Sequence, residues 1–128
     1  MRLLLDTHTL VWWLLASPRL SAAAREALGL PRALIHVSAA SAWELATKVR
    51  AGKWPDAADI AERLDELVAA HGLVPAPITI AHGRVAGGFD TPHRDPFDRI
   101  LAAQAMLDDM TLVTADPVFR AFEVRVVW

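Results

Sequence analysis

The sequence predicts one α/β domain over residues 1–128, a three-layer α/β/α sandwich around a central parallel sheet of about five strands. Two observations indicate this fold class. Short apolar runs alternate with longer segments of helical character along all 128 residues, which is the pattern of parallel strands joined by helical crossovers. The composition, 54% hydrophobic and 22% charged, is that of a globular protein with its own core.

The first part of the chain supplies two strands and four helices. Leu3-Leu4-Leu5 is expected to be a buried strand, followed by an apolar helix from about Thr7 to Ala16. A short helix over Ser21–Leu28 precedes a second strand, Leu34–Val37, and a helix that reaches about Ala51. The clearest amphipathic helix opens at Pro55-Asp56 and ends at Gly72, with an apolar face made of Ile60, Leu64, Leu67 and Val68.

The second half continues the alternation. A third strand begins at Leu73-Val74 and is expected to be stopped by Pro75 and Pro77. The remaining elements are a helix near Thr79–Ala86, a loop over Gly87–Arg94, a helix from Asp95-Pro96 through Leu107, a strand at Thr111–Thr114, a helical turn at Pro117–Phe122 and a last strand at Val124–Val127. Ligands of such a sheet are expected beyond the carboxyl ends of its strands.

Composition and motifs exclude several classes of protein. The chain has no cysteine, which excludes disulfides and Cys-based zinc sites, and its net charge of −2 gives no overall basic field for nucleic acid. The longest apolar run, Leu10–Ala16, is too short to cross a membrane, and Asp6 interrupts any export signal, so we expect a cytoplasmic protein. Ser-hydrolase, P-loop, dinucleotide-binding and H-E-x-x-H motifs do not occur.

Carboxylates at the strand-to-helix junctions remain as candidates for chemistry. They are Asp6, Glu44, Asp95, Asp98 and Asp116. Each also has a structural interpretation: the aspartates suit helix N-caps or first turns, and Ser41-Ala42-Trp43-Glu44 matches a capping box. The junctions of a parallel sheet share one edge, however, so the acids are expected to meet and repel. An all-oxygen site of this kind suits Mg²⁺ or Mn²⁺.

Four segments carry motifs in a distinctive order and spacing: Leu3–His8, Val37–Lys48, His93–Ala105 and Leu112–Asp116. Together they resemble the PIN-domain ribonucleases, and most closely the VapC toxins of bacterial toxin–antitoxin pairs. The resemblance implies a metal-dependent endoribonuclease that cleaves single-stranded or loop RNA. Water held by the cation would attack phosphorus, and the ribose 3′ oxygen would leave.

Matched residue by residue, the resemblance implies a site built by the acids. Asp6 and Asp98 are the expected direct metal ligands, whereas Glu44 and Asp116 would hold water or a second ion and assist deprotonation. Supporting roles near the metal are expected for Asp95, which equally suits a helix cap, and for Thr7 and Thr114, which either hydrogen-bond metal-bound water or simply terminate their strands.

Contacts to RNA phosphates are predicted for Arg94, Arg99 and Lys48, with solvated ion pairs as the alternative. The histidines His8 and His93 flank acidic positions but are not expected to be metal ligands. Trp12 and Trp13 are interpreted as core or interface residues in preference to base-stacking ones.

The resemblance further implies a VapB-like antitoxin, whose C-terminal segment would cover the acidic cleft, and a homodimer. Two alternatives stay open: a PIN-fold RNA-processing nuclease without a toxin role, and a phospho-acceptor signalling domain. The second needs a lysine late in the chain, and the last lysine is Lys53.

Overall fold

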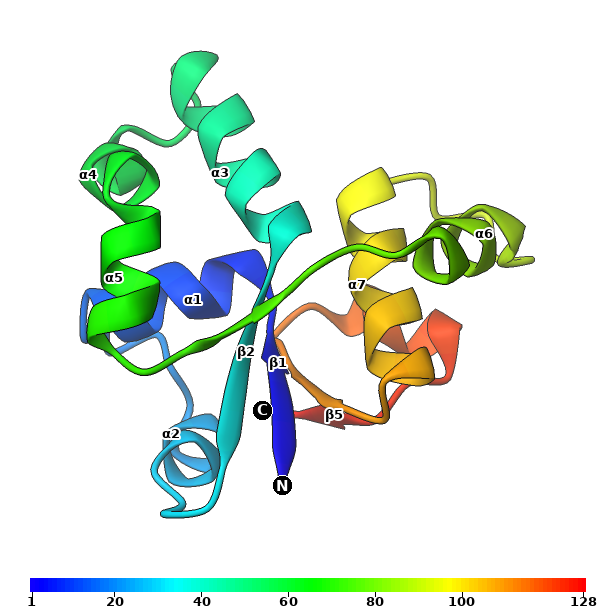
Figure 1. Ribbon diagram of the computed structural model, residues 1–128, viewed down its shortest axis with the longest axis horizontal. Helices are drawn as coiled ribbons and strands as arrows, with labels where there is room; N and C mark the ends of the chain where they lie inside the picture. The colour runs from blue at the N-terminus through cyan, green and yellow to red at the C-terminus, as the bar shows by residue number, and fades with distance from the viewer.

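A five-stranded parallel sheet forms the centre of the protein in the computed structural model, which describes residues 1–128 (Figure 1). The strand order is β3-β2-β1-β4-β5, and every neighbouring pair is parallel. The strands are β1 (Arg2–Leu5), β2 (Leu34–Ser38), β3 (Val74–Ala76), β4 (Thr111–Val113) and β5 (Val126–Val127). This sheet confirms the predicted fold class.

Helices cover both faces of the sheet. The α-helices are α1 (Thr7–Leu14), α2 (Ala22–Leu28), α3 (Ala39–Arg50), α4 (Ala58–Glu62), α5 (Leu64–Ala70), α6 (Ile80–Gly88) and α7 (Pro96–Leu107), with short 3₁₀ helices η1 (Pro55–Ala57) and η2 (Pro117–Phe122). In Figure 1, α1, α2, α4 and α5 lie on one side of β1 and β2, and α6 and α7 lie on the other.

The central strand β1 divides the core into two apolar clusters. Leu3 and Leu5 belong to the cluster under α1, α2, α4 and α5, whereas Leu4 belongs to the cluster under α7 and η2. Successive side chains of a strand point to opposite faces, so a run of three leucines serves both layers. All three are fully buried, as expected for the middle strand of a sheet covered on both faces.

The order of the strands places a crevice between β1 and β4. The chain moves outward from β1 through β2 to β3 and then returns to the other side of β1 with β4. In doubly wound sheets, ligands bind at such a reversal, beyond the carboxyl ends of the strands. Asp6 follows β1 directly and Thr114 follows β4 directly, so both residues stand at this point.

Two element predictions need correction. The third strand continues through Pro75 and ends at Ala76, directly before Pro77, the second of the two prolines expected to stop it. Pro75 is tolerated because β3 is an edge strand and Pro75 needs no amide hydrogen bond on its outer side. The amphipathic segment after Trp54 is not one helix but η1, α4 and α5, with a break at Arg63 (φ −103°, ψ 16°). Its apolar face still points inward across the break, and Gly72 ends it at φ +65° as predicted.

Candidate active site

The four acidic residues expected to hold the metal and its water line one cavity of about 100 Å³ at the carboxyl edge of the sheet. Asp6 comes from the end of β1, Glu44 from α3, Asp98 from the first turn of α7, and Asp116 from the β4–η2 junction. The lining is completed by Thr7, His8, Lys48 and Asp95, so it contains no hydrophobic residue. Segments more than 100 residues apart in the chain thus build one polar site.

Asp6 is buried, with 7% of its surface exposed. Its Oδ1 caps α1 by accepting the backbone N–H of His8 (2.7 Å) and Thr9 (3.4 Å). Its Oδ2 accepts the hydroxyl of Thr114 at 2.5 Å. Burial raises the pKa of Asp6, and the hydrogen bonds from Thr114 and His8 oppose that rise. The structure confirms that Asp6 is a helix cap. Its second carboxylate oxygen, Oδ2, has only the Thr114 hydroxyl as a hydrogen-bond partner.

Glu44 is buried in the middle of α3, and the predicted capping box is wrong. The N-cap of α3 is Ser38, whose hydroxyl accepts the N–H of Ala40, so Ser41 already lies inside the helix and accepts the Thr7 hydroxyl at 2.9 Å. Glu44 is 5% exposed and pairs with Lys48 Nζ, one helical turn on, at 2.5 Å. Glu44 therefore has no capping role and directs its charge to the cavity.

Asp98 lies in the first turn of α7, three residues after the N-cap residue Asp95. Asp95 caps the helix by accepting the N–H of Phe97 (2.9 Å) and Asp98 (3.3 Å). The Asp98 carboxylate accepts a hydrogen bond from His93 Nε2 at 2.8 Å. The pKa of Asp98 is raised to about 6, mainly by burial and also by the charges of Asp95 and Glu44, against the lowering effect of the His93 hydrogen bond.

Asp116 closes the cavity from the exposed side. It caps η2 by accepting the N–H of Val118 at 3.0 Å, and its own N–H donates to the Thr114 hydroxyl at 3.0 Å. Thr114 therefore links Asp116 to Asp6 across the crevice between β1 and β4. This places Thr114 where the sequence predicts a supporting residue.

Arg99 has a different role from the predicted one. Its guanidinium donates five hydrogen bonds to backbone carbonyls, namely those of Ala86, Gly87, Phe89, Thr91 and His93. All five N–H donors of an arginine are then engaged, so none is left for a phosphate. Arg99 thereby fixes the loop before α7, and this loop brings His93 into contact with Asp98. Arg94 is exposed, and Lys48 lines the acidic cavity.

Two histidines reach the site, although neither is expected there as a metal ligand. His8 lines the cavity from the first turn of α1, and His93 contacts Asp98. In the sequence, only their proximity to acidic residues pointed to these histidines: His8 lies two residues after Asp6, and His93 lies two residues before Asp95. The sequence gives no indication that the loop before α7 folds back to bring His93 onto Asp98.

The donor set fits a hard divalent cation. The four acids supply oxygen only, which Mg²⁺ and Mn²⁺ prefer, and two of them, Asp6 and Asp98, have a raised pKa that a neighbouring cation would lower. No group of three or more His, Asp or Glu side chains forms a ready-made ligand cluster. Instead, Thr114, Lys48 and His93 donate to Asp6, Glu44 and Asp98 respectively.

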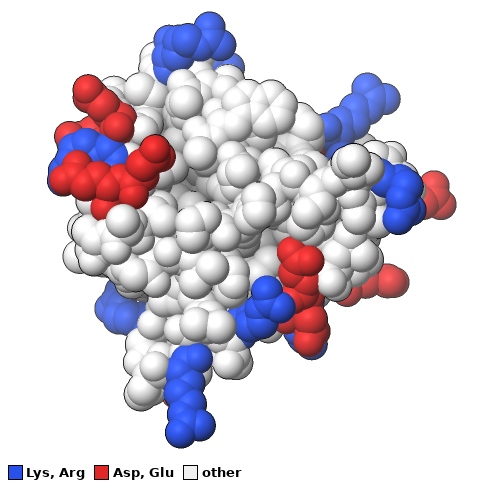
Figure 2. Space-filling model, viewed as in Figure 1, with Lys and Arg blue, Asp and Glu red and all other residues white.

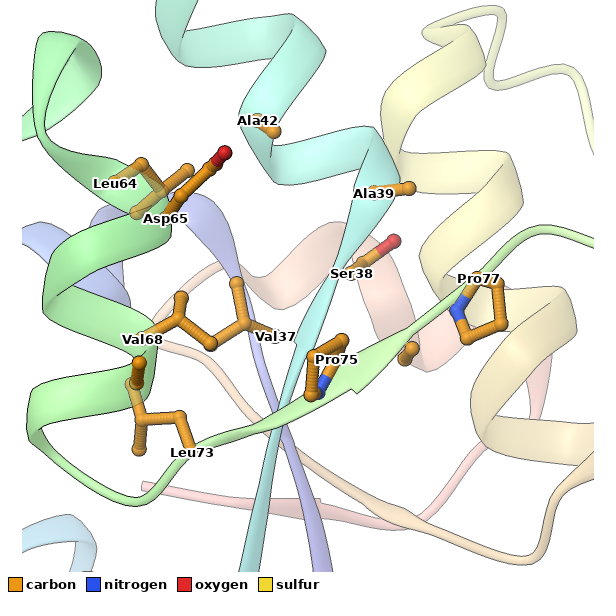
Figure 3. A pocket seen from close by; sticks show the side chains of 12 residues that line it. Val37, Ser38, Ala39, Ala42, Leu64, Asp65, Val68, Leu73, Pro75 and Pro77 are labelled. Carbon is orange, nitrogen blue, oxygen red and sulfur yellow. The ribbon is translucent and has the colours of Figure 1, made fainter.

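A second, larger cavity of about 520 Å³ lies between α5, the start of α3 and β3. Figure 3 shows it lined by aliphatic and proline side chains, with Ser38 and Asp65 as its polar members. Figure 2 shows the whole molecule from the same side as Figure 1. Most Lys, Arg, Asp and Glu side chains lie toward the edge of this face, and most of its middle is uncharged. This face offers no set of groups for acid–base or metal chemistry, so the chemistry of the site is assigned to the acidic cavity.

The fold and the cavity together define an α/β domain with an acidic site at its topological switch point. The chain belongs to the PIN domain family, whose sequence model matches residues 3–124. No curated protein sequence matches the chain. None of its helices has the length and apolar character needed to span a membrane.

The fold is similar to that of several solved structures. A chain of VapBC2 from Rickettsia felis, bound to a DNA fragment from its promoter, has a TM-score of 0.71 at 18% identity, over 98% of this chain and 97% of that one. A chain of VapBC-1 from nontypeable Haemophilus influenzae has a TM-score of 0.68 at 16% sequence identity, over 98% of this chain and 96% of that one. A chain of FitAcB from Neisseria gonorrhoeae has a TM-score of 0.65 at 21% sequence identity, over 97% of this chain and 95% of that one. At these identities the likeness shows a shared fold.

The buried charge of Asp6 leads to a prediction about metal-free stability. Asp6→Asn keeps the helix cap, since Asn caps as well as Asp, and removes a carboxylate whose burial raises its pKa. In EDTA the variant is expected to be more stable than wild type, on the order of 1 kcal/mol for each pKa unit relieved. Mg²⁺ should raise the melting temperature of wild type and raise that of the variant much less. Equal melting temperatures of both proteins in both buffers would leave Asp6 as a cap only.

Asp98 predicts a pH dependence of stability in EDTA. Its carboxyl has a pKa of about 6 in the folded protein and 3.8 as the ordinary value, so the folded state binds more protons between these values. The free energy of unfolding should therefore fall as pH rises from about 4 to 6. Because the group is partly open to solvent, we expect a fall of about 1–2 kcal/mol. Urea unfolding at several pH values measures it, and Asp98→Asn should flatten the profile. An identical profile for both proteins would contradict the prediction.

Proposed function

We propose that this protein is a Mg²⁺- or Mn²⁺-dependent endoribonuclease that cleaves single-stranded or loop RNA in the cytoplasm, and that it is the toxin of a toxin–antitoxin pair. The observation that carries the proposal is the cavity at the switch point of a PIN domain, where Asp6, Glu44, Asp98 and Asp116 converge. Four carboxylates around one small cavity are costly without a cation and suited to holding one.

The residues of the cavity divide the work of phosphodiester hydrolysis. Bound Mg²⁺ or Mn²⁺ would supply positive charge against the phosphodiester and lower the pKa of a water molecule. In the proposal Asp6 and Asp98 hold the cation through their carboxylate oxygens. Glu44 and Asp116 orient water, and one of them accepts the proton of the attacking water while the ribose 3′ oxygen leaves.

Neighbouring side chains would position these groups and the substrate. Thr114 fixes Asp6, Thr7 ties the start of α1 to Ser41 of α3, and Asp95 holds the start of α7. Lys48, beside Glu44 and 33% exposed at its side chain, is proposed to contact a phosphate oxygen, as is the exposed Arg94. Arg99 is left out of this RNA-contacting set because backbone carbonyls occupy its donors.

Cleavage of a labelled single-stranded RNA by the purified protein tests the proposal. Cleavage is expected with Mg²⁺ or Mn²⁺, should stop in EDTA, and should leave a 3′ hydroxyl when water attacks phosphorus and the 3′ oxygen leaves. Sequencing the new ends of cellular RNA after induced expression would identify the target. A protein that leaves RNA intact with either metal would refute the nuclease proposal.

The proposed partner is a VapB-like antitoxin, supported by the likeness to chains from VapBC and FitAcB structures. Its C-terminal segment is proposed to cover the acidic cavity with an arginine against the carboxylates. The exposed Trp43, 59% accessible on α3, offers apolar surface for it nearby. Co-purification with the product of the adjacent gene, followed by light scattering, tests the pairing. A protein that retains no partner and is harmless on expression would count against the toxin role.

A homodimer is also proposed, with both acidic cavities open along one shared groove. Two-fold pairing is the commonest assembly of small soluble proteins. Sedimentation at micromolar concentration should give twice the mass of the 14.0 kDa chain. A species of monomer mass alone would refute the dimer.

A further inference from the structure

A column of aromatic rings stands beside the acidic cavity. The imidazole of His8 stacks on the indole of Trp54, with ring centroids 4.6 Å apart and planes 29° apart. Trp12 lies against the same imidazole at 5.8 Å, and Trp128 lies against Trp12 at 5.7 Å. These rings come from α1, from the segment before η1 and from the end of the chain, so the tertiary fold assembles the column.

Two members of the acidic cavity connect it to this column. His8 lines the cavity and also stacks on Trp54. Lys48 lines the cavity, pairs with Glu44 at 2.5 Å, and holds its ammonium 5.8 Å from the centroid of the Trp54 ring. The place for a phosphate and the ring column are therefore immediate neighbours.

The two stacked rings, Trp54 and His8, differ in how far the protein covers them. Trp54 is half-buried and packs against the core cluster under α1, α2, α4 and α5, whereas His8 is exposed. A ring needed only for core packing would be covered. An exposed ring backed by a fixed indole is instead a rigid flat surface, and such surfaces bind unpaired nucleobases by stacking.

We propose that the exposed imidazole of His8, backed by Trp54, is a stacking platform for a base of the RNA substrate next to the phosphate that is cleaved. The inference rests on the proposed nuclease function and adds a base-binding subsite to it. Stacking accepts any base, because every base has a π-face, so the platform selects unpaired nucleotides over paired ones. Trp12, expected to be a core or interface residue, is here a side support of the platform.

Fluorescence anisotropy with a labelled eight-nucleotide single-stranded RNA tests the platform, in EDTA and in the Asp98→Asn background so that the RNA stays intact. Adding Trp54→Leu should weaken binding about tenfold, the effect of losing one stacked base. Trp54→Phe, which keeps an aromatic ring, should restore most of the affinity. His8→Leu, a change at an exposed position, should weaken binding to a similar degree.

Two controls separate base stacking from a structural effect. Trp13→Leu is the same change on the neighbouring α1 ring that contacts His71 and not His8, and it should leave RNA affinity unchanged. An abasic oligomer of equal length should bind equally to all the proteins. The platform is overturned if Trp54→Leu binds RNA like its parent, if it loses equal affinity for both oligomers, or if the parent binds no RNA.

The wild-type cleavage assay reports separately on the proposed function. RNA cleavage by wild type together with unchanged affinity in Trp54→Leu would overturn the platform alone. Base-dependent binding that requires Trp54, without cleavage in Mg²⁺ or Mn²⁺, would overturn the nuclease proposal alone.

Discussion

Asp98→Asn is expected to lower the rate of Mg²⁺-dependent RNA cleavage about a thousandfold while the protein stays folded. The substitution removes one of the two carboxylates proposed to hold the cation, whose charge stabilisation is worth several kcal/mol in the transition state. The fold should survive because Asp95, not Asp98, caps α7, and the amide oxygen of Asn still accepts a hydrogen bond from His93. Initial rates at saturating Mg²⁺ measure the loss.

Asp90→Asn provides the matched control for this prediction. Asp90 is an exposed aspartate in the loop before α7, it lies outside the acidic cavity, and the change in charge is the same. Its cleavage rate should match that of wild type. A folded Asp98→Asn protein with wild-type cleavage would show that Asp98 holds no cation needed for the reaction.

The fold could be predicted because its main signals are local in the sequence. Leu3-Leu4-Leu5 serves two apolar layers at once, which only a strand covered on both faces requires. The errors came where position in the sheet overrides local preference. Pro75 ends a central strand but is tolerated in an edge strand, and the edge position of β3 depends on the order of all five strands.

The candidate acids could be brought together from the sequence for a similar reason. All strand ends of a parallel sheet meet at one edge, so Asp6 and Asp116 were expected to lie close, and both line the cavity. The mutual repulsion predicted among the acids is a secondary cause of the raised pKa of Asp98, and burial is the first. Burial depends on packing, which the spacing of acids along the chain does not contain.

The contacts that depend on how loops and helix ends fold could not be predicted from the sequence. Ser38 and Ser41 both precede a helical run, and only the backbone shows that Ser38 is the cap. Trp54 carries no motif, yet the chain turns after α3 and stacks it on His8. Arg99 looked like a phosphate ligand because it stands beside the acids, whereas its partners are carbonyls at the end of α6 and in the loop that follows it.

Arg99→Lys is expected to lower the free energy of unfolding by about 2–4 kcal/mol. The guanidinium reaches five carbonyls between Ala86 and His93, at 2.7 Å for Ala86 and Phe89 and 2.8 Å for His93. A lysine keeps the charge but has three donors on one nitrogen, so it cannot span carbonyls that surround a planar fork. Hydrogen bonds to charged groups contribute more than neutral ones, and urea unfolding measures the loss.

Arg94→Lys is the matched control for this effect, since Arg94 is an exposed arginine of the same loop. Its stability should stay within about 0.5 kcal/mol of wild type. Hydrogen exchange at the loop amides of residues 87–94 should accelerate in Arg99→Lys and not in Arg94→Lys. Because this loop brings His93 to Asp98, loosening it should also weaken metal-dependent cleavage. If Arg99→Lys is as stable as Arg94→Lys, the carbonyls do not depend on the guanidinium, and Arg99 returns to the set of residues available for RNA.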